Sequence, residues 1–495
     1  MIDFDNLAGY RENNYIEAKK ATGGLPNSIW ETYSAFANTN GGYILLGVEE
    51  LPDKSLHMIG LNDPDKLIVD FWNIVNNSTK VNINILRDKN VQIVEREGKR
   101  IIVIDVPRAE RTDKPIYLNN DIWNAYRRNG EGDYRCSKEV IRAMLRDGAA
   151  TTQDMVVLEK MSFSVFDYET VKGYRNAMGV TRPNHVWESL DNDDFLLKLG
   201  AIARGEDDKL HPTAAGLLMF GFEYEIVREY PRYFLDYQEQ FSLSLRWSDR
   251  ITSTSGEWSG NLYGFYQKAY NKLVQNPGIK IPFKLEGGLR VDDTPVHGAL
   301  REALANCLVN ADYYGEGGVV IKNHTDRIVF ENPGNLRIKI EEAISGGFSS
   351  PRNAVLMKMF NLLDIGERAG SGIPNIFDVW QAQKWEQPQI DERLGNVERT
   401  ILSLPIMKVP IKSADKKVPI KDADKSEHSR TVALKNLIIQ FAEKNGEIKS
   451  SDLREPLGVG ETRVKTLLRE LVADGVLLAE GGNRNRTYRI NPDKK

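Results

Sequence analysis

Cysteine and long hydrophobic runs are scarce in this sequence of 495 residues. The cysteines are Cys136 and Cys307 alone, which excludes a disulfide framework, a cysteine-based zinc site and an iron–sulfur cluster. The longest apolar run, residues 214–220, is far shorter than the roughly 20 residues of a membrane span. The first five residues lack the basic and apolar regions of a signal peptide. We therefore expect a soluble, cytoplasmic protein with no membrane partner.

A large excess of either charge is also missing. The chain has 66 Lys and Arg against 70 Asp and Glu, a net charge of −4, so the whole chain has no general attraction to nucleic acid or anionic lipid. A P-loop is missing too. The one Gly-Lys pair, Gly98-Lys99, is followed by Arg100 and has no glycine five residues before Gly98. This absence argues against a P-loop helicase.

The clearest boundary is a nine-residue tandem repeat, residues 408–416 followed directly by residues 417–425. The repeat is charged and poor in large apolar groups, so it indicates a linker that does not pack into a core. Softer boundaries are expected near residues 149–152 and 277–278. The sequence thus predicts an N-terminal domain at 1–145, a mixed connector at 150–285, a third domain at 286–407, a linker at 408–427 and a small domain at 428–495.

Carboxylates flank the first predicted helix–strand unit. Residues 26–38 have the apolar spacing of an amphipathic helix, and residues 43–48 indicate a buried strand. Glu12 and Glu17 precede the helix, and Glu50 closes the strand. Three converging carboxylates would form an oxygen site for Mg²⁺ or Mn²⁺ that activates water for phosphodiester cleavage. The alternative is three solvated surface carboxylates.

The residues of this region resemble a known family. Glu17-Ala-Lys19, residues 30–48 with their Ala-Phe-Ala-Asn-Thr-Asn-Gly-Gly core, and residues 126–134 are similar to the Schlafen-type AlbA domain over about residues 1–145. The resemblance implies association with nucleic acid. It also implies a metal-binding catalytic triad of Glu12, Glu17 and Glu50, the last in place of the usual Asp. Arg127 and Arg128 would then lie near enough to bind a phosphate.

The predicted connector shows no catalytic constellation. The segment after residue 290, in contrast, contains several candidate nucleotide-binding residues. Residues 296–310 indicate a helix in which Glu302 and Asn306 share one face. A carboxylate can orient an attacking water, and an amide oxygen one turn away can bind a phosphate-bound Mg²⁺. The glycine-rich residues 366–374 open a further helix, whose N–H groups could bind phosphates.

A predicted hairpin at residues 319–330 lies between these two features. In this order they resemble a divergent GHKL ATPase domain over about residues 285–405. The resemblance implies that Glu302 is catalytic and that Asn306 binds Mg²⁺. It implies further ATP-binding roles for Asn332, Gly334, Arg352, Gly370 and Gly372. One departure concerns residues 310–313, Asn-Ala-Asp-Tyr, where relatives commonly have His-Arg-Asp-Tyr. The missing basic residue bears on hydrolysis more than on binding.

The last segment differs in charge from the rest. Residues 429–495 hold 13 Lys and Arg against 9 Asp and Glu, a net charge of +4 that suits a nucleic-acid reader. A predicted helix, a strand and a basic hairpin tip follow one another, and this order resembles a winged helix-turn-helix. The resemblance implies that Arg463 and Arg469 project from the recognition helix and that Arg484 and Arg486 reach phosphates. The alternative is a winged helix used for dimerisation or partner docking.

The complete chain thus resembles a bacterial regulator of α+β multidomain architecture. The expected parts are a Schlafen-type AlbA domain, a mixed connector, a GHKL α/β sandwich and a winged helix, an arrangement often labelled RecG-like or a predicted transcriptional regulator. Our leading hypothesis is an ATP-responsive, nucleic-acid-binding regulator in transcription or defence. The alternative is a metal-dependent RNA or DNA endonuclease licensed by ATP, with an antiphage role. Expected partners are DNA at the winged helix, RNA at the AlbA domain and a second copy of the chain.

Overall fold

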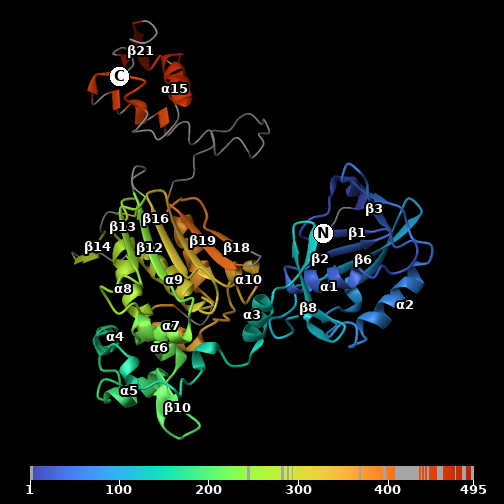
Figure 1. Cartoon of the computed structure of the whole chain (residues 1–495), viewed down its shortest axis with the longest axis horizontal. Coiled ribbons are helices and arrows are strands. Elements are labelled where there is room, and N and C mark those ends of the chain that lie inside the picture. Colours follow the sequence, from blue (N-terminus) through green and yellow to red (C-terminus); the bar gives the residue numbers. More distant parts are fainter. Residues whose placement is uncertain are drawn as a thin grey trace. The chain divides into compact units, whose positions relative to one another are not determined.

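The computed structural model (Figure 1) separates into two units, Met1–Val409 and Pro410–Lys495. In the first unit it describes residues 4–241, 246–279, 284–286, 289–291, 294–366, 370–393 and 397–406. In the second it describes residues 434–435, 437–439, 441–442, 445–453, 461–473, 475–481 and 486–491. The predicted linker at 408–427 lies outside the described residues. Every helix in the described part is too short or too polar to cross a lipid bilayer.

The N-terminal region is built on a four-stranded sheet in the order β1-β2-β6-β5. Its strands are β1 (Ile16–Lys19), β2 (Gly42–Leu46), β6 (Lys99–Val106) and β5 (Val91–Arg96). The predicted helix and strand are confirmed as α1 (Ile29–Asn38) and β2. Ile29, Tyr33 and Phe36 of α1 are fully buried against the sheet, because the apolar residues recur at helical spacing. β1 and β2 are parallel, which sets Glu17 beside Ile44.

A second, three-stranded sheet of β7 (Tyr117–Leu118), β8 (Asp121–Asn129) and β9 (Gly132–Arg135) packs on α1. The buried Asn38 connects the two, since its Oδ1 accepts from Ile116 N at 2.8 Å and its Nδ2 donates to Tyr126 O at 3.0 Å. Two short strands, β3 (Val48–Glu50) and β4 (Leu56–Met58), and α2 (Pro64–Val75) complete the region. The asparagine of the Ala-Phe-Ala-Asn core is thus a structural tie between helix and sheet.

The predicted boundary between a connector and a separate domain at 286 is wrong. One six-stranded sheet has the order β13-β12-β16-β17-β19-β18, and its first two strands come from the supposed connector. The strands are β13 (Asp249–Thr252), β12 (Leu235–Gln240), β16 (Val319–His324), β17 (Arg327–Pro333), β19 (Arg399–Pro405) and β18 (Gln389–Arg393). β12 pairs in parallel with β16 along its whole length. Paired strands share backbone hydrogen bonds, so the two segments form one domain.

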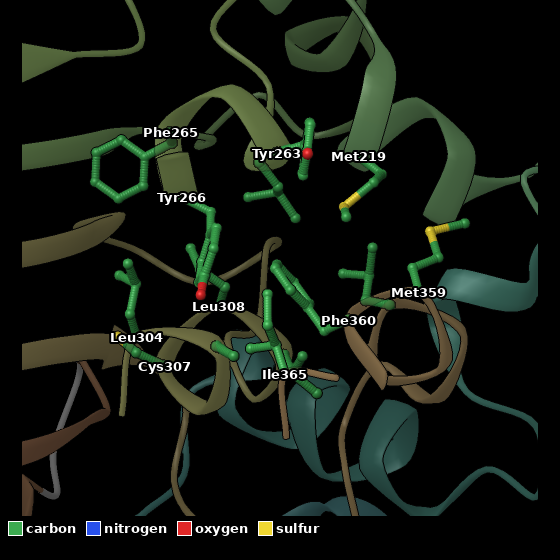
Figure 2. Packing of buried hydrophobic residues seen from close by; sticks show 14 of the residues in the cluster. Met219, Tyr263, Phe265, Tyr266, Leu304, Cys307, Leu308, Met359, Phe360 and Ile365 are labelled. Carbon is green, nitrogen blue, oxygen red and sulfur yellow. The ribbon is translucent and has the colours of Figure 1, made fainter. Parts of the chain in front are cut away.

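The core confirms this correction. The helices α8 (Leu262–Leu273) and α9 (Pro295–Val309) lie against the sheet, with α12 (Gly372–Ala382) beside α9 (Figure 1). Figure 2 shows Met219 and Tyr266 of the supposed connector packed with Leu308 of α9 and Phe360. All four side chains are buried, in one cluster that extends from Leu158 to Ile406. A shared apolar core of this extent is the mark of a single folding unit.

The remaining elements of the first unit surround this core. Its other helices are α3 (Lys138–Gly148), α4 (Tyr168–Thr181), α5 (Asn192–Leu199), α6 (Ala214–Phe220), α7 (Glu223–Glu229), α10 (Ile340–Ser345) and α11 (Ala354–Asn361). Its other strands are β10 (Ile202–Arg204), β11 (Leu210–Pro212), β14 (Lys284–Glu286) and β15 (Leu289–Val291). Short 3₁₀ turns occur at Phe4–Gly9, Asp88–Asn90, Gln153–Met155 and Phe163–Val165. The helix α3 follows directly on the N-terminal region, so it joins that region to the large domain.

The second unit contains β20 (Glu447–Lys449), α15 (Glu461–Ala473), β21 (Leu477–Glu480) and β22 (Thr487–Ile490). Its strands form one sheet in the order β20-β22-β21, and β21 and β22 are an antiparallel pair. Val464, Leu467, Leu468 and Leu471 of α15 are buried in one cluster with Ile448 and Tyr488. This small sheet and helix therefore have a core of their own.

Candidate functional site

The helix α9 positions two of the predicted site residues. Pro295 occupies its first turn after the N-cap Thr294, a position where proline's missing N–H costs no hydrogen bond. Glu302 and Asn306 follow one turn apart, and Nδ2 of Asn306 donates to Oε1 of Glu302 at 2.9 Å. Only 9% of the surface of Glu302 is exposed. The amide therefore holds a buried carboxylate in one orientation.

Glycines bring the start of α12 up to this carboxylate. A Cβ atom at Gly372 would overlap Oε1 of Glu302, and one at Gly366 would lie 3.6 Å from Oε2. Gly370 has φ +70°, and a Cβ there would lie 2.5 Å from the carbonyl oxygen of Phe348. The first N–H groups of a helix have no partner within the helix. The glycines thus allow an electropositive helix end to approach Glu302 closely.

Glu302, Asn306, Gly370 and Gly372 all line one cavity of about 60 Å³. Its wall also includes Asn310, Leu336, Arg337, Ile338, Phe348 and Ser350. Pockets for nucleotide-sized ligands usually measure about 300–1,000 Å³. In this conformation the cavity has room for part of a phosphate chain but not for a complete nucleotide.

Three predicted ATP contacts lie elsewhere. Asn332 donates to Pro333 O at 3.2 Å, and neither it nor Gly334 lines this cavity. Arg352 fills the space beside Gly334, where a Cβ would lie 2.9 Å from its Nη2. Its guanidinium donates to Asn310 O at 3.0 Å and forms an ion pair with Asp147. The predicted nucleotide role of Arg352 does not match this conformation, because the protein itself uses each arm of the guanidinium.

The carboxyl end of α3 collects further guanidinium groups. The Asp147 carbonyl accepts from Arg111 at 2.8 Å and from Arg337 at 2.6 Å. Cations at a helix carboxyl end complement the helix dipole. Burial, with the neighbouring Arg111 and Arg352, lowers the pKa of Arg337 to about 10. Burial would also lower the pKa of Arg352, but Asp147 and Asp312 together raise it. This cluster of arginines was not predicted from the sequence. Arg337, three residues after the predicted Gly334, was the one residue that could have indicated it.

The three N-terminal carboxylates influence one another. Glu12 accepts from Ala18 N at 2.9 Å, and its pKa is raised by burial first and by the charges of Glu17 and Glu50 next. Glu17 forms an ion pair with Arg128 at 2.8 Å, and Glu50 forms one with Lys54 at 3.2 Å. The charges of Glu17 and Glu50 thus act on Glu12, and the predicted convergence of the three carboxylates stays a prediction.

The predicted metal-binding geometry is not found. Across the ranges that the structure describes, no group of three or more His, Cys, Asp or Glu side chains is arranged to hold a metal ion. Arg128 is the physical reason at Glu17, because its buried guanidinium already neutralises that carboxylate. The guanidinium of Arg128 therefore pairs with Glu17, the carboxylate that was expected to bind a metal ion.

The predicted phosphate contact of Arg128 does not match this conformation. Arg128 is 1% exposed and is bound to Asp133 at 3.0 Å and to Asn13 O at 3.1 Å. Arg127 forms an ion pair with Glu398 of the large domain. The Arg128 guanidinium is thus used inside the protein, whereas Nε of Arg127 is buried without a hydrogen-bond partner among the described residues. In the second unit Arg469 and Arg486 are exposed, while the Arg463 side chain and Arg484 lie outside the described residues.

Comparisons with known protein families match three stretches of the chain. Residues 12–137 match the family "Schlafen, AlbA_2", and residues 316–401 match "Putative ATP-dependent DNA helicase recG C-terminal". Residues 142–236 match a domain of unknown function, DUF8451. Glu302 and Asn306 precede the second of these ranges. The comparison with curated proteins found no match.

Two solved structures are similar in part. The N-terminal domain of a putative ATP-dependent DNA helicase RecG-related protein from Nitrosomonas europaea has 35% identity over 27% of this chain and 90% of that one, with a TM-score of 0.21. The DIP2311 protein from Corynebacterium diphtheriae has 16% identity over 96% of this chain and 95% of that one, with a TM-score of 0.38.

These matches and the architecture define an α+β multidomain protein of mixed sheets and helices. The chain belongs to the proteins with an N-terminal Schlafen AlbA_2 domain, and it carries a second domain of the RecG C-terminal, ATPase-like type.

Proposed function

We propose that this protein is an ATP-responsive, nucleic-acid-binding regulator whose nucleotide binds between α9 and the start of α12. The observation that carries the proposal is the cavity shared by Glu302, Asn306, Gly370 and Gly372. These residues are up to 70 positions apart in sequence, and the fold brings them to one wall. The match of residues 316–401 to a RecG-type ATPase-like domain supports the same assignment.

The side chains present fit a magnesium nucleotide. Asn306 uses Nδ2 to bind Glu302, which leaves its Oδ1 as the kind of hard oxygen ligand that Mg²⁺ prefers. The bare backbone at Gly372 lets the N-terminus of α12, the kind of helix end that binds phosphate, lie directly beside Glu302. Bound ATP–Mg²⁺ would supply the phosphoryl group. Glu302 is placed to accept a proton from water there.

Arg337 supports a route from the nucleotide to the rest of the molecule. It lines the candidate cavity and also donates to Pro351 O and to Asp147 O at the end of α3. Entry of a complete nucleotide displaces the segment that holds Arg337. The hydrogen bond from Arg337 to Asp147 O at the end of α3 then changes as well. Since α3 follows directly on the AlbA_2 domain, nucleotide state biases that domain.

The second unit is proposed as the DNA reader. Its helix α15 and the β21–β22 pair fit a winged helix, and Arg469 and Arg486 are exposed. Replacing Arg484 and Arg486 with Ala should weaken binding to every duplex sequence and lower the slope of log affinity against log salt by about 2. An unchanged slope would show that this hairpin does not face nucleic acid.

The experiment for the complete proposal is fluorescence anisotropy of labelled DNA and RNA with the full chain, with and without ATP–Mg²⁺. ATP–Mg²⁺ should shift the nucleic-acid affinity of the intact protein and leave that of Asn306→Ala unchanged. Asn271→Ala is the matched control, because Asn271 is an exposed helical asparagine outside the cavity. An intact protein that binds nucleic acid equally with and without ATP contradicts the proposal.

The competing function is metal-dependent nucleic-acid cleavage by the AlbA_2 domain. One observation favours it, the electrostatic coupling of Glu12 with Glu17 and Glu50. Cleavage of labelled RNA and DNA with Mn²⁺ should then occur and be lost in Glu17→Ala. Cleavage that survives this substitution would exclude the triad as the catalytic site.

A further inference from the structure

A second cavity, of about 180 Å³, lies between the AlbA_2 domain and the RecG-type domain. From the first domain it is lined by Arg108, Lys114 and Arg127, and from the second by Arg337, Glu392 and Glu398. It shares residues 336–338, Phe348 and Ser350 with the candidate nucleotide cavity. The two cavities are therefore neighbours separated by a common segment of chain.

Some of the charges in this cavity are paired within the protein. Arg108 forms an ion pair with Glu392 at 3.2 Å, and Arg127 forms one with Glu398. Lys114 differs from both. Its Nζ donates to Asn38 O at 3.0 Å, and within the described ranges no carboxylate forms an ion pair with it. A lysine amine without a carboxylate partner thus remains in a partly buried wall that also contains four arginines, Arg108, Arg111, Arg127 and Arg337.

Two buried donors at this cavity lack an acceptor within the part of the chain that the structure describes. Nε of Arg127 and Nε of Arg337 are buried and have no hydrogen-bond partner among the described residues. Burial, together with repulsion from Arg108 and Arg127, lowers the pKa of Lys114 well below its usual value. Glu392 and Asp147 offset this only in part. Unsatisfied buried donors are costly, and an anion would satisfy them.

We propose that this cavity is a binding site for a phosphate group, held by Lys114, Arg108 and Arg127 at the junction of the two domains. The cavity, of about 180 Å³, has room for a phosphate group. Guanidinium and ammonium groups are the side chains that bind phosphate through charge-assisted hydrogen bonds. The group can come from free phosphate or from the phosphorylated end of a nucleic-acid strand.

The site goes beyond the proposed ATP-responsive function, because none of its three cations lines the candidate nucleotide cavity. A phosphate there would bridge the AlbA_2 domain and the segment 336–338, which forms part of both cavities. A ligand bound in one cavity would then change the ligand affinity of the other through this shared segment.

The test is calorimetric titration of the full chain with inorganic phosphate. Lys114→Met, which removes the charge at similar length, should weaken phosphate binding about tenfold or more, since a hydrogen bond to a charged group is lost. Lys99→Met is the matched control, because Nζ of Lys99 also donates to a backbone carbonyl, Met58 O at 2.9 Å, but lies outside the cavity. Asn306→Ala should bind phosphate as the intact protein does.

Two further arms complete the test. Oligonucleotides with a 5′-phosphate should bind more tightly than matched 5′-hydroxyl strands if the strand end is the source, and equally if free phosphate is. Hydrogen exchange on the intact protein needs no variant, and phosphate should slow exchange in residues 107–114 and 335–339. Equal phosphate affinity in Lys114→Met and Lys99→Met, or unchanged exchange in these segments, would overturn the proposal. Loss of phosphate binding in Asn306→Ala alone would place the anion in the nucleotide cavity instead.

Discussion

Asn306 Nδ2 donates a hydrogen bond to Glu302 Oε1 across one turn of α9, at 2.9 Å. This contact joins the proposed magnesium ligand to the proposed base before any nucleotide arrives. It also fixes which amide atom remains for the metal, since Nδ2 is already used. The two residues therefore have separable roles, and each role can be tested by its own substitution.

Glu302→Gln is expected to separate binding from turnover. The amide keeps the size of the carboxylate but cannot take a proton from water, so ATP hydrolysis should fall about 100-fold or more. ATP affinity should stay within about threefold, because Glu302 is not proposed to hold the phosphates. Calorimetry and phosphate release measure the two quantities. Turnover in the variant equal to that of the intact protein would remove Glu302 from the reaction.

Gly372→Ala tests the close approach at the start of α12. The new Cβ would overlap Oε1 of Glu302, so the helix end or the carboxylate must move. We expect ATP affinity to fall about tenfold or more, with a stability loss of about 1–3 kcal/mol. Gly298→Ala in α9 is the matched control, because its Cβ would meet nothing closer than 3.8 Å. Equal ATP affinity in the two variants would contradict the assigned phosphate cradle.

Asp147→Asn tests the ion pair between Asp147 of α3 and Arg352. The substitution removes the charge that pairs with Arg352 and keeps the backbone carbonyl that Arg337 and Arg111 bind. Freed guanidinium groups can turn to the nucleotide, so ATP affinity should rise several-fold in calorimetry. Asp364→Asn, which breaks the Arg182–Asp364 ion pair, should leave the affinity unchanged. A lower affinity in Asp147→Asn would show that the ion pair supports the binding conformation.

Glu12→Gln tests the coupling of the acidic residues through pH. The pKa of Glu12 is raised above its ordinary value of 4.5, so the folded state binds its proton more tightly than the unfolded chain. Stability contributed by this group is therefore greatest at low pH and is lost as pH rises through the raised pKa. Glu12→Gln should raise the thermal midpoint at pH 7, and the gain should vanish towards pH 4.

Glu95→Gln serves as the control for this pH series, because Glu95 is an exposed carboxylate of β5 in the same domain. It should shift the thermal midpoint little at either pH. A Glu12→Gln variant that is less stable than the intact protein at pH 7 would show that the Glu12 charge stabilises the fold.

Local patterns predicted much of this fold. Helical spacing gave α1, α9 and α15, and the order of Glu302, Asn306 and the glycines gave one wall of the candidate cavity. Each of these follows from contacts a turn apart or from the backbone freedom of glycine. Sheet partners were harder to predict, because strands far apart in sequence pair through hydrogen bonds that no local pattern specifies. The pairing of β12 with β16 therefore overturned the predicted domain boundary.

The charged residues show the same limit. Arg128 was predicted to bind a phosphate and Arg352 to bind ATP, yet the fold directs both inward to carboxylates. Sequence reveals that an arginine is present, but only the tertiary structure decides which acid it meets. Asp147 was missed for the same reason, because its partners are more than 30 residues away in either direction.

The most direct test of the central claim is calorimetric titration of ATP–Mg²⁺ into the full chain and into Asn306→Ala, with Asn271→Ala as the control. We expect ATP–Mg²⁺ to bind the intact protein and the control, and to bind Asn306→Ala at least about tenfold more weakly, because a metal ligand is lost. Equal affinity of all three proteins for ATP–Mg²⁺ would contradict this claim.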